Sequence, residues 1–449
     1  MSDNNNNNNN GESSRTSMVE PLIIRLLLTS DLPRKRSNSY EFAGRTYIGY
    51  SELAFNLAKV CKRWFKLVSC SINSVDIVQF VTNNDNTDLS ALLMMIRGEQ
   101  TTKQKFPIVN KLQSLTIRGG NQANITRELI ETLVDEQKEG KLDGITSSIE
   151  HVFAFTFGMG DIPSDFYDML ENCQSVFPSL DSLSLYRDDR QEEAGSPLYL
   201  FLVDLPCFNY IKYLNCQIQR DTEDDNEESS SELLTALSKN PFLKFLDLTM
   251  KEGMSIGRLV YYFASWSTLE YIKIQCYTGV GDMTQEGLDA LYMVMRENNK
   301  LKDVNFGNLG LDEMSLDTKD GIQQALAANK CIINLDVNYS LFYTKTKSTN
   351  IISQTVQQFK LVHKSFQEFN DQCKYETVTD SILEIISGNT HPNLTNMHIT
   401  FVVGGEELDQ FKQRVVDALS TNTTLRSFSY NTFCGGTISP STALRFPTS

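Results

Sequence analysis

One apolar template recurs along most of the chain: an aliphatic residue, two arbitrary positions, a second aliphatic residue, one position and a third apolar residue. The ten copies begin at positions 112, 149, 180, 211, 243, 269, 301, 332, 394 and 425. Six of the nine intervals are 31 or 32 residues. The interval of 62 is twice 31, which predicts a concealed copy at Val356, Phe359 and Leu361. A sustained period of this length indicates stacked repeats rather than separate globular domains.

A second pattern precedes several copies. Asn240, Asn298, Asn329 and Asn422 each lie three residues before the first apolar residue of a copy. The segments in front of them carry apolar residues at helical spacing. Because asparagine tolerates a left-handed backbone, we expect it to end a helix and turn the chain into a strand. Each unit is therefore predicted to be a strand, a loop, a helix and an asparagine turn.

Together, the two patterns resemble the leucine-rich repeat, in its longer helix-bearing form similar to ribonuclease inhibitor. The resemblance covers residues 112–430 and implies an α/β solenoid, a horseshoe with a parallel concave sheet and outer helices. We expect this solenoid over residues 111–435. The other expected parts are a disordered Asn-rich tail at 1–17, a small all-α module at 18–75, a connecting or capping segment at 76–110 and a C-terminal tail at 436–449.

The N-terminal module carries a second resemblance. Pro21 and an aliphatic run open its first expected helix, and a Val-Cys-Lys-Arg-Trp string ends at Trp64. These features resemble an F-box, a short helical module that docks onto the adaptor of cullin-type ubiquitin ligases. The adaptor-binding residues that this resemblance implies are Pro21, Leu22, Ile24, Val60, Cys61, Trp64 and Phe65. The alternative is that Trp64 and Phe65 cap the first repeat, since end repeats need capping.

Aromatic residues are expected on the concave face. Residues that flank the second template position point away from the core, because side chains alternate along a strand. This puts Tyr213, Phe245 and Tyr271 in one column, with Phe153 and Tyr186 on the strands just before. Exposed aromatic residues mark binding surfaces, so these five are predicted to contact a client protein. The alternative is a register slipped by one residue, which would turn the rings into the core.

No residue pattern in the sequence indicates catalysis, a cofactor or a metal site. The four histidines, His151, His363, His391 and His398, are far apart and are expected to be ordinary surface or loop residues. Phosphate-binding loops and serine-nucleophile motifs are absent from the sequence. We therefore predict no catalytic residue, no cofactor, no metal and no small-molecule substrate.

Charge and hydropathy limit the classes of partner that the chain is expected to bind. A formal charge of −15 argues against nucleic-acid binding, and no stretch approaches the roughly 20 apolar residues that cross a bilayer. Nine cysteines without a metal-type pair or a visible signal peptide favour a cytoplasmic or nuclear protein. The expectation is a non-catalytic interaction subunit, the substrate receptor of a cullin-type ubiquitin ligase. The N-terminal module would bind the adaptor and the solenoid would bind the client. The alternative is a leucine-rich-repeat scaffold or regulator with no ligase link.

Overall fold

The computed structural model describes the chain in separate stretches, which fall into two units, Met1–Gly195 and Ser196–Ser449. The described residues are 39–42, 45–48, 57, 62–76, 113–118, 135, 139, 149–157, 178–188, 210–218, 239–250, 267–276, 285–307, 314–342, 352–362, 372–388, 390–401, 406–434, 437–438 and 442–445. The expected tail at 1–17 and nearly all of the 76–110 segment lie outside them. No helix among the described residues is long and apolar enough to cross a membrane.

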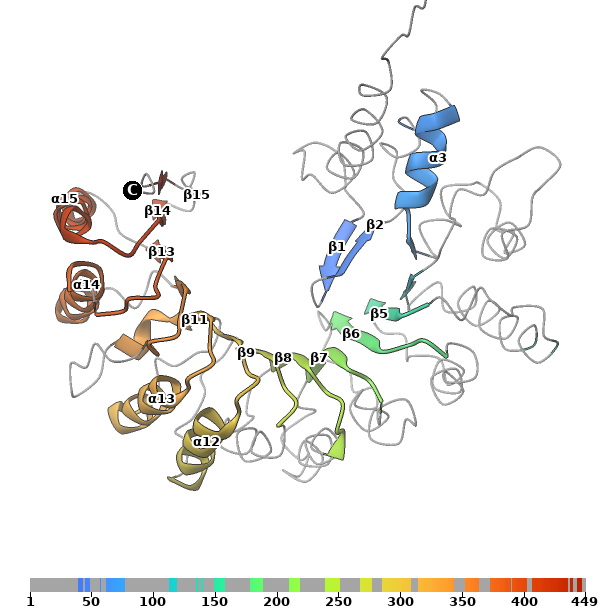
Figure 1. The fold of residues 1–449 in the computed structure, drawn as a ribbon, viewed down its shortest axis with the longest axis horizontal. Helices are drawn as coiled ribbons and strands as arrows, with labels where there is room; N and C mark the ends of the chain where they lie inside the picture. The colour runs from blue at the N-terminus through green and yellow to red at the C-terminus, as the bar shows by residue number, and fades with distance from the viewer. Residues whose placement is uncertain are drawn as a thin grey trace, which may run out of the picture. The chain divides into compact units, whose positions relative to one another are not determined.

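The first unit contains a short parallel sheet and a hairpin. Four strands pair in parallel and in chain order: β3 (Ser74–Asp76), β4 (Ser114–Arg118), β5 (His151–Phe157) and β6 (Ser182–Asp188). The hairpin consists of β1 (Ser39–Phe42) and β2 (Arg45–Ile48), which pair antiparallel. The helix α3 (Lys62–Ser71) leads directly into β3 (Figure 1).

Two expectations about the N-terminal part need correction. The module is not all-α, because the β1–β2 hairpin lies inside residues 18–75. Its first strand alternates polar and apolar residues, and two residues, Ala43-Gly44, separate it from the second strand, a spacing typical of hairpins. The parallel sheet also starts at β3, ahead of the expected residue 111. The buried Ile72 takes the first template position there, but its separation from Leu112 is 40 residues, which departs from the repeat period.

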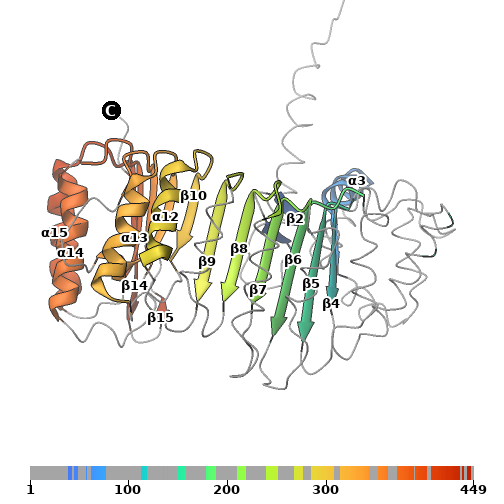
Figure 2. The same cartoon turned by 90° about the horizontal axis from the view of Figure 1, so that it is seen from below.

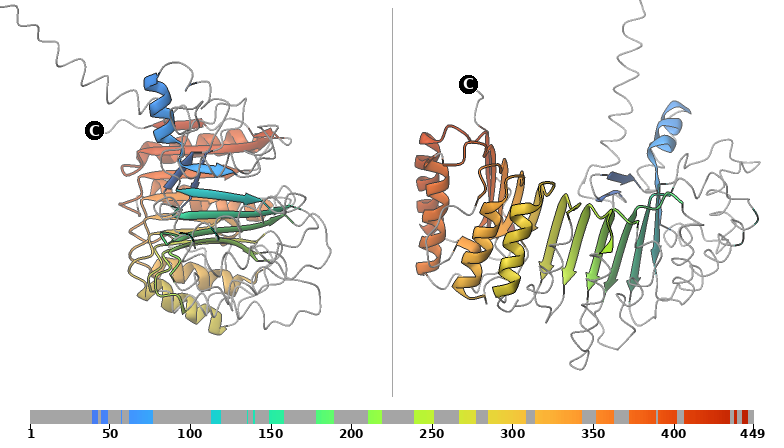
Figure 3. Two further views of the ribbon diagram at one scale, coloured as in Figure 1. Left: turned by 90° about the vertical axis from the view of Figure 1, so that its right-hand side faces the viewer. Right: turned by 60° about the horizontal axis from the view of Figure 1, so that its bottom comes forward.

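The second unit is a larger parallel sheet with helices on one side. Its parallel strands, again in chain order, are β7 (Tyr213–Ile218), β8 (Phe245–Met250), β9 (Tyr271–Cys276), β10 (Asp303–Phe306), β11 (Asn334–Asn338), β12 (Gln358–Val362), β13 (Asn396–Phe401) and β14 (Ser427–Cys434). The helices are α12 (Gln285–Glu297), α13 (Leu316–Ala328), α14 (Gln372–Ser387) and α15 (Glu406–Thr421), and a short 3-10 helix, η3 (Tyr339–Phe342), follows β11. The four helices line one side of the strands, and no helix among the described residues lies on the opposite side (Figures 1 and 3). Strands β7–β9 run side by side in one direction (Figure 2).

The apolar template forms the core of both sheets. Residues at its second position are at most 2% exposed in all the described copies, which are Leu115, Val152, Leu183, Leu214, Leu246, Ile272, Val304, Leu335, Phe359, Met397 and Phe428. The predicted strand register is therefore correct, and the weaker copies on β5 and β7 are confirmed. The concealed copy is confirmed as β12, where Phe359 and Leu361 are buried. It divides the long interval into 24 and 38 residues, because η3 stands where other repeats have a longer helix.

The repeated asparagines act through their side chains, and the backbone of Asn329 is not left-handed. Asn329 ends α13 at φ −72° and ψ 138°, an extended conformation. Its Nδ2 donates to the carbonyl oxygen of Met295 in the preceding repeat at 2.8 Å, and its Oδ1 accepts from the backbone N–H of Ile332 at 2.7 Å. Asn298 makes the equivalent contacts with Leu269 and Leu301. Each asparagine thus joins its own turn to the repeat before it.

The C-terminal residues are not simply a tail. The strands β15 (Thr437–Ile438) and β16 (Thr442–Arg445) both pair antiparallel with β14. An edge strand exposes unpaired N–H and C=O groups, and returning strands satisfy part of that edge. The expectation of a tail over 436–449 is therefore wrong for these residues.

Candidate functional site

The residues predicted to bind an adaptor lie at the margin of the described chain. Pro21, Leu22, Ile24, Val60 and Cys61 are outside the described residues. Trp64 and Phe65 both lie on α3, and the Trp64 side chain is half-buried. An adaptor surface on this module therefore stays a prediction from the sequence.

Three of the predicted client-binding residues form an aromatic ladder, which we define as Tyr213, Phe245 and Tyr271. The strand register pairs Tyr213 with Phe245 and Phe245 with Tyr271. The Phe245 and Tyr271 rings stack with centroids 4.0 Å apart and planes 6° apart, while Tyr213 and Phe245 are 6.4 Å apart and tilted. All three side chains are partly exposed. Since their neighbours Leu214, Leu246 and Ile272 are buried, the rings lie on the face opposite the core.

The other two predicted client-binding residues belong to the first unit. Phe153 lies on β5 opposite Ser184, whereas Tyr186 lies on β6 opposite Phe155. The register therefore separates Phe153 from Tyr186 by two positions along the strands. In the column position that corresponds to the ladder, β4, β5 and β6 carry Ser114, His151 and Ser182 instead. A continuous aromatic column does not extend through these strands.

A polar hollow of about 410 Å³ begins where the ladder ends. Tyr271 is on its wall, and beyond it the ladder column continues with smaller polar side chains. The side chains that line the hollow include Tyr271, Asp303, Asn305, Asn334, Asp336, Gln358, Lys360, Asn396, His398, Ser427 and Ser429. They come from strands β9 to β14, at the two positions of each strand that flank a buried template residue. The hollow thus results from replacing rings by shorter side chains along one row.

Charged residues of both signs lie beside the ladder and in the hollow. Lys273 Nζ is 2.8 Å from Asp247 Oδ2, and Lys360 Nζ is 3.2 Å from Asp336 Oδ2. Burial raises the pKa of Asp336, and Lys360 opposes that shift. Asp303 accepts a hydrogen bond from Asn334 and forms no ion pair with any residue that the structure describes. Its carboxylate is therefore not neutralised by a neighbouring cation.

Sequence reasoning missed this charged row, although a signal was present. Asp247, Lys273, Asp336 and Lys360 all lie one residue after the second template position. On a strand, that position shares a face with the ladder. Charges recurring there mark a solvent-facing row, as opposite-charge pairs between adjacent strands are favourable.

The histidines are less ordinary than expected. His391 is 2% exposed, and its Nε2 lies 3.0 Å from the carbonyl oxygen of Ile352. It stands three residues before Leu394 and takes the place of the turn asparagine in that repeat. His398 lines the hollow with Nδ1 2.6 Å from Ser429 Oγ, and burial lowers its pKa. His363 lies outside the described residues.

His151 is fully buried in the first unit. Its Nδ1 is 3.1 Å from Ser114 Oγ, and its Nε2 is 3.0 Å from Ser184 Oγ. Burial, with a smaller effect of Arg45, lowers the pKa of His151 to about 3. A serine beside a histidine resembles a nucleophile and its base, but Ser114 and His151 are both 0% exposed and no substrate can reach them. We interpret the pair as a buried structural contact on the sheet face opposite the template core. Within the described part of the chain, no cluster of side chains could hold a metal ion.

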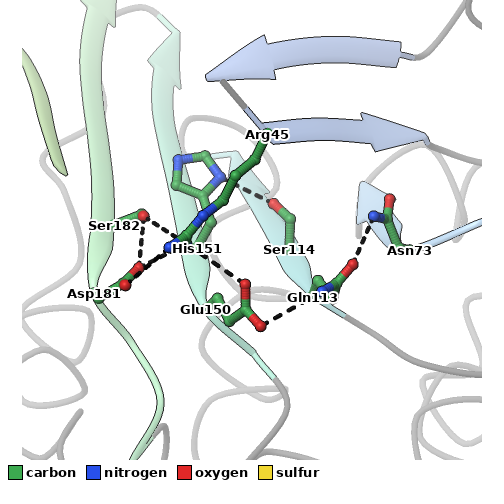
Figure 4. Close-up of polar contacts among 8 residues, drawn as sticks. All are labelled: Arg45, Asn73, Gln113, Ser114, Glu150, His151, Asp181 and Ser182. Atoms are coloured by element: carbon green, nitrogen blue, oxygen red, sulfur yellow. Dashed lines mark hydrogen bonds and ion pairs between the residues drawn. The ribbon is translucent and has the colours of Figure 1, made fainter. Parts of the chain in front are cut away.

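A polar chain in the first unit joins the hairpin to the sheet. Arg45 NH1 and NH2 donate to the two oxygens of Asp181 at 2.7 and 3.0 Å, and Glu150 Oε2 is 3.5 Å from Arg45 NH1 (Figure 4). Gln113 and Asn73 continue the chain from Glu150 toward β3. Arg45 is thus held by a bidentate carboxylate, the strongest geometry that a guanidinium can adopt. This arrangement anchors the hairpin to the starts of strands β5 and β6.

Comparison with known proteins assigns no family to the chain. The chain matches no protein-family profile and no curated protein. Among solved structures it is similar to a Bacteroides fragilis protein that was a structural-genomics target, with 10% identity, a TM-score of 0.30, and coverage of 68% of this chain and 74% of that chain. So distant a likeness carries no argument about the site. What the described strands and helices establish is an α/β, solenoid-like repeat fold built on parallel strands.

Proposed function

We propose that this chain is a non-catalytic recognition protein of the leucine-rich-repeat type, which holds a partner protein on the sheet face of its second unit that lies opposite helices α12–α15. The observation that carries the proposal is the aromatic ladder. Three partly exposed rings in one row, next to a polar hollow, combine the apolar anchor and polar rim of protein interfaces. Tyrosine in particular is enriched among the residues that dominate binding energy.

Replacing the ladder residues with serine, as Tyr213→Ser, Phe245→Ser and Tyr271→Ser together, is expected to spare folding and abolish partner binding. The rings are partly exposed, so their loss leaves the buried template intact. The measurement is quantitative mass spectrometry of proteins that co-purify with each variant from cells that make the chain. The matched control is Tyr292→Ser with Met293→Ser, two exposed residues on α12. Identical sets of partners for the wild type and the ladder variant would contradict the proposal.

A more specific proposal is that the chain is the substrate receptor of a cullin-type ubiquitin ligase. Its support is the Val-Cys-Lys-Arg-Trp string that ends at Trp64, whose last three residues lie in α3. In that case the chain performs no chemistry and raises the effective concentration of the client near the ligase. The alternative is a scaffold or regulator of the same fold without a ligase adaptor.

The double substitution Trp64→Ala and Phe65→Ala is expected to abolish co-purification of the adaptor, because aromatic anchors at interfaces contribute about 2 kcal/mol or more each. The exposed Lys66 on the same helix provides a control as Lys66→Ala. Immunoblots for the adaptor and the cullin measure the result. Normal adaptor binding by the double variant would place the docking surface elsewhere. A wild-type chain that brings down neither protein would favour the scaffold.

A further inference from the structure

The stacked end of the aromatic ladder leaves one ring face toward the polar hollow. Phe245 covers one side of Tyr271 at a centroid distance of 4.0 Å. On the other side the register places Asp303, whose side chain is shorter than a ring. Both Tyr271 and Asp303 line the hollow. A flat group that enters the hollow can therefore lie against the second face of Tyr271.

The charges around that ring favour a cation. Burial raises the pKa of Tyr271, and the carboxylates of Asp247, Asp303 and Asp336 raise it further, so all three act on its hydroxyl group. The lysines of this row oppose only two of them, since Lys273 pairs with Asp247 and Lys360 pairs with Asp336. Among the described residues no cation pairs with Asp303, and His398, whose pKa burial lowers, adds no positive charge at neutral pH.

Two residues that line the hollow also carry acceptor oxygens without donors. Asn334 Oδ1 and Asp336 Oδ1 have no hydrogen-bond partner, although both are covered by neighbouring atoms. A buried acceptor without a donor costs free energy. The terminal torsion of an aspartate is broad, so the Asp336 carboxylate can turn to meet a donor that enters the hollow. A ligand with several N–H groups would satisfy these acceptors better than a ligand with a single donor.

We infer that the hollow receives an arginine side chain of the partner protein, with its guanidinium stacked on Tyr271 and paired with Asp303. Arginine is flat, carries five donors and stacks on aromatic rings, whereas lysine is a compact, strongly hydrated charge. The chain already holds one arginine by carboxylates, since Arg45 is bound by Asp181 and Glu150 in the first unit. This inference rests on the proposed function and names the chemistry of the partner at that face.

The test uses the full chain and two resin-bound pools of random nonapeptides, one with arginine and one with citrulline at the central position. Citrulline keeps the shape of arginine but carries no charge. At about 150 mM salt, we expect the wild type to bind the arginine pool about tenfold more than the citrulline pool, as charge-assisted hydrogen bonds are worth that much. A third pool with central lysine should bind less than the arginine pool, because an ammonium does not stack as a plane.

Matched variants distinguish an effect of the hollow from an effect of the net charge of the chain. Asp303→Asn with Asp336→Asn should bring the arginine-to-citrulline ratio close to one. Asp289→Asn with Asp417→Asn removes the same charge from α12 and α15 and should leave the ratio unchanged. Tyr271→Leu should remove the preference for arginine over lysine. An equal fall of the arginine-to-citrulline ratio in both aspartate variants would overturn the inference. Equal binding of the arginine and citrulline pools by the wild type would overturn it too. The proposed function would still stand if the ladder variant lost its cellular partner, and it would fail if that variant kept it.

Discussion

Replacing Leu246 with alanine is expected to lower the free energy of unfolding of the second unit by about 2–5 kcal/mol. Leu246 is 0% exposed and lies at the second template position of β8. The substitution removes buried methyl groups and leaves a cavity between neighbours that are held by their own strand pairing. Urea unfolding followed by circular dichroism measures the loss. Val416→Ala, at a site 52% exposed on α15, serves as the control and should change stability by less than about 0.5 kcal/mol.

The same variant also tests the repeat architecture. In a stack of repeats each unit contacts only its neighbours, so the damage should spread outward from β8. Hydrogen exchange in Leu246→Ala should therefore rise first in peptides from β7 and β9, which pair with β8. Peptides from β13 and β14 should keep their protection until more denaturant is added. Equal loss of protection along all the strands of this unit would argue against stacked repeats.

The second large effect is an acid sensitivity of the first unit that arises from His151. The folded pKa of His151 is about 3, against 6.5 for an ordinary histidine. Below pH 6.5 the unfolded chain therefore binds a proton that the folded chain does not, and stability falls as the pH falls. The slope approaches about 1.4 kcal/mol per pH unit and ends near the folded pKa. Above pH 6.5 the contribution is fully present and constant.

The comparison that isolates this effect is between the wild type and His151→Gln. Glutamine can still bond to Ser114 or Ser184 but does not titrate, so the variant should lose stability less steeply between pH 6.5 and about pH 4. Pulse proteolysis in urea, read out on peptides from β4 to β6, reports on this unit alone. Carboxylates contribute equally to both curves and cancel in the difference. Parallel pH curves for the two proteins would show that His151 is not buried in its neutral form.

The repeat core could be predicted from sequence because its signal is local and periodic. Each strand buries alternate residues on one face, so Leu183, Leu246 and Leu335 had to be aliphatic wherever a copy occurs. The same alternation placed Tyr213, Phe245 and Tyr271 on the opposite face, and their partial exposure follows from it. Even the concealed copy on β12 was visible, because burial requires the same template whatever the length of the connection that precedes it.

Contacts between distant residues were decided only by the tertiary structure. No local pattern links Arg45 to Asp181, which lie 136 residues apart, and no local pattern buries His151 between two serines. The turn asparagines were recognised by spacing, yet their role depends on carbonyl groups of the preceding repeat, about 30 residues away. The hollow beside Tyr271 likewise exists because six strands align in register, so that Asp303, Asp336 and Lys360 become neighbours. A sequence specifies which side chains each strand presents, because alternation is local, whereas which of them meet depends on the pairing between strands.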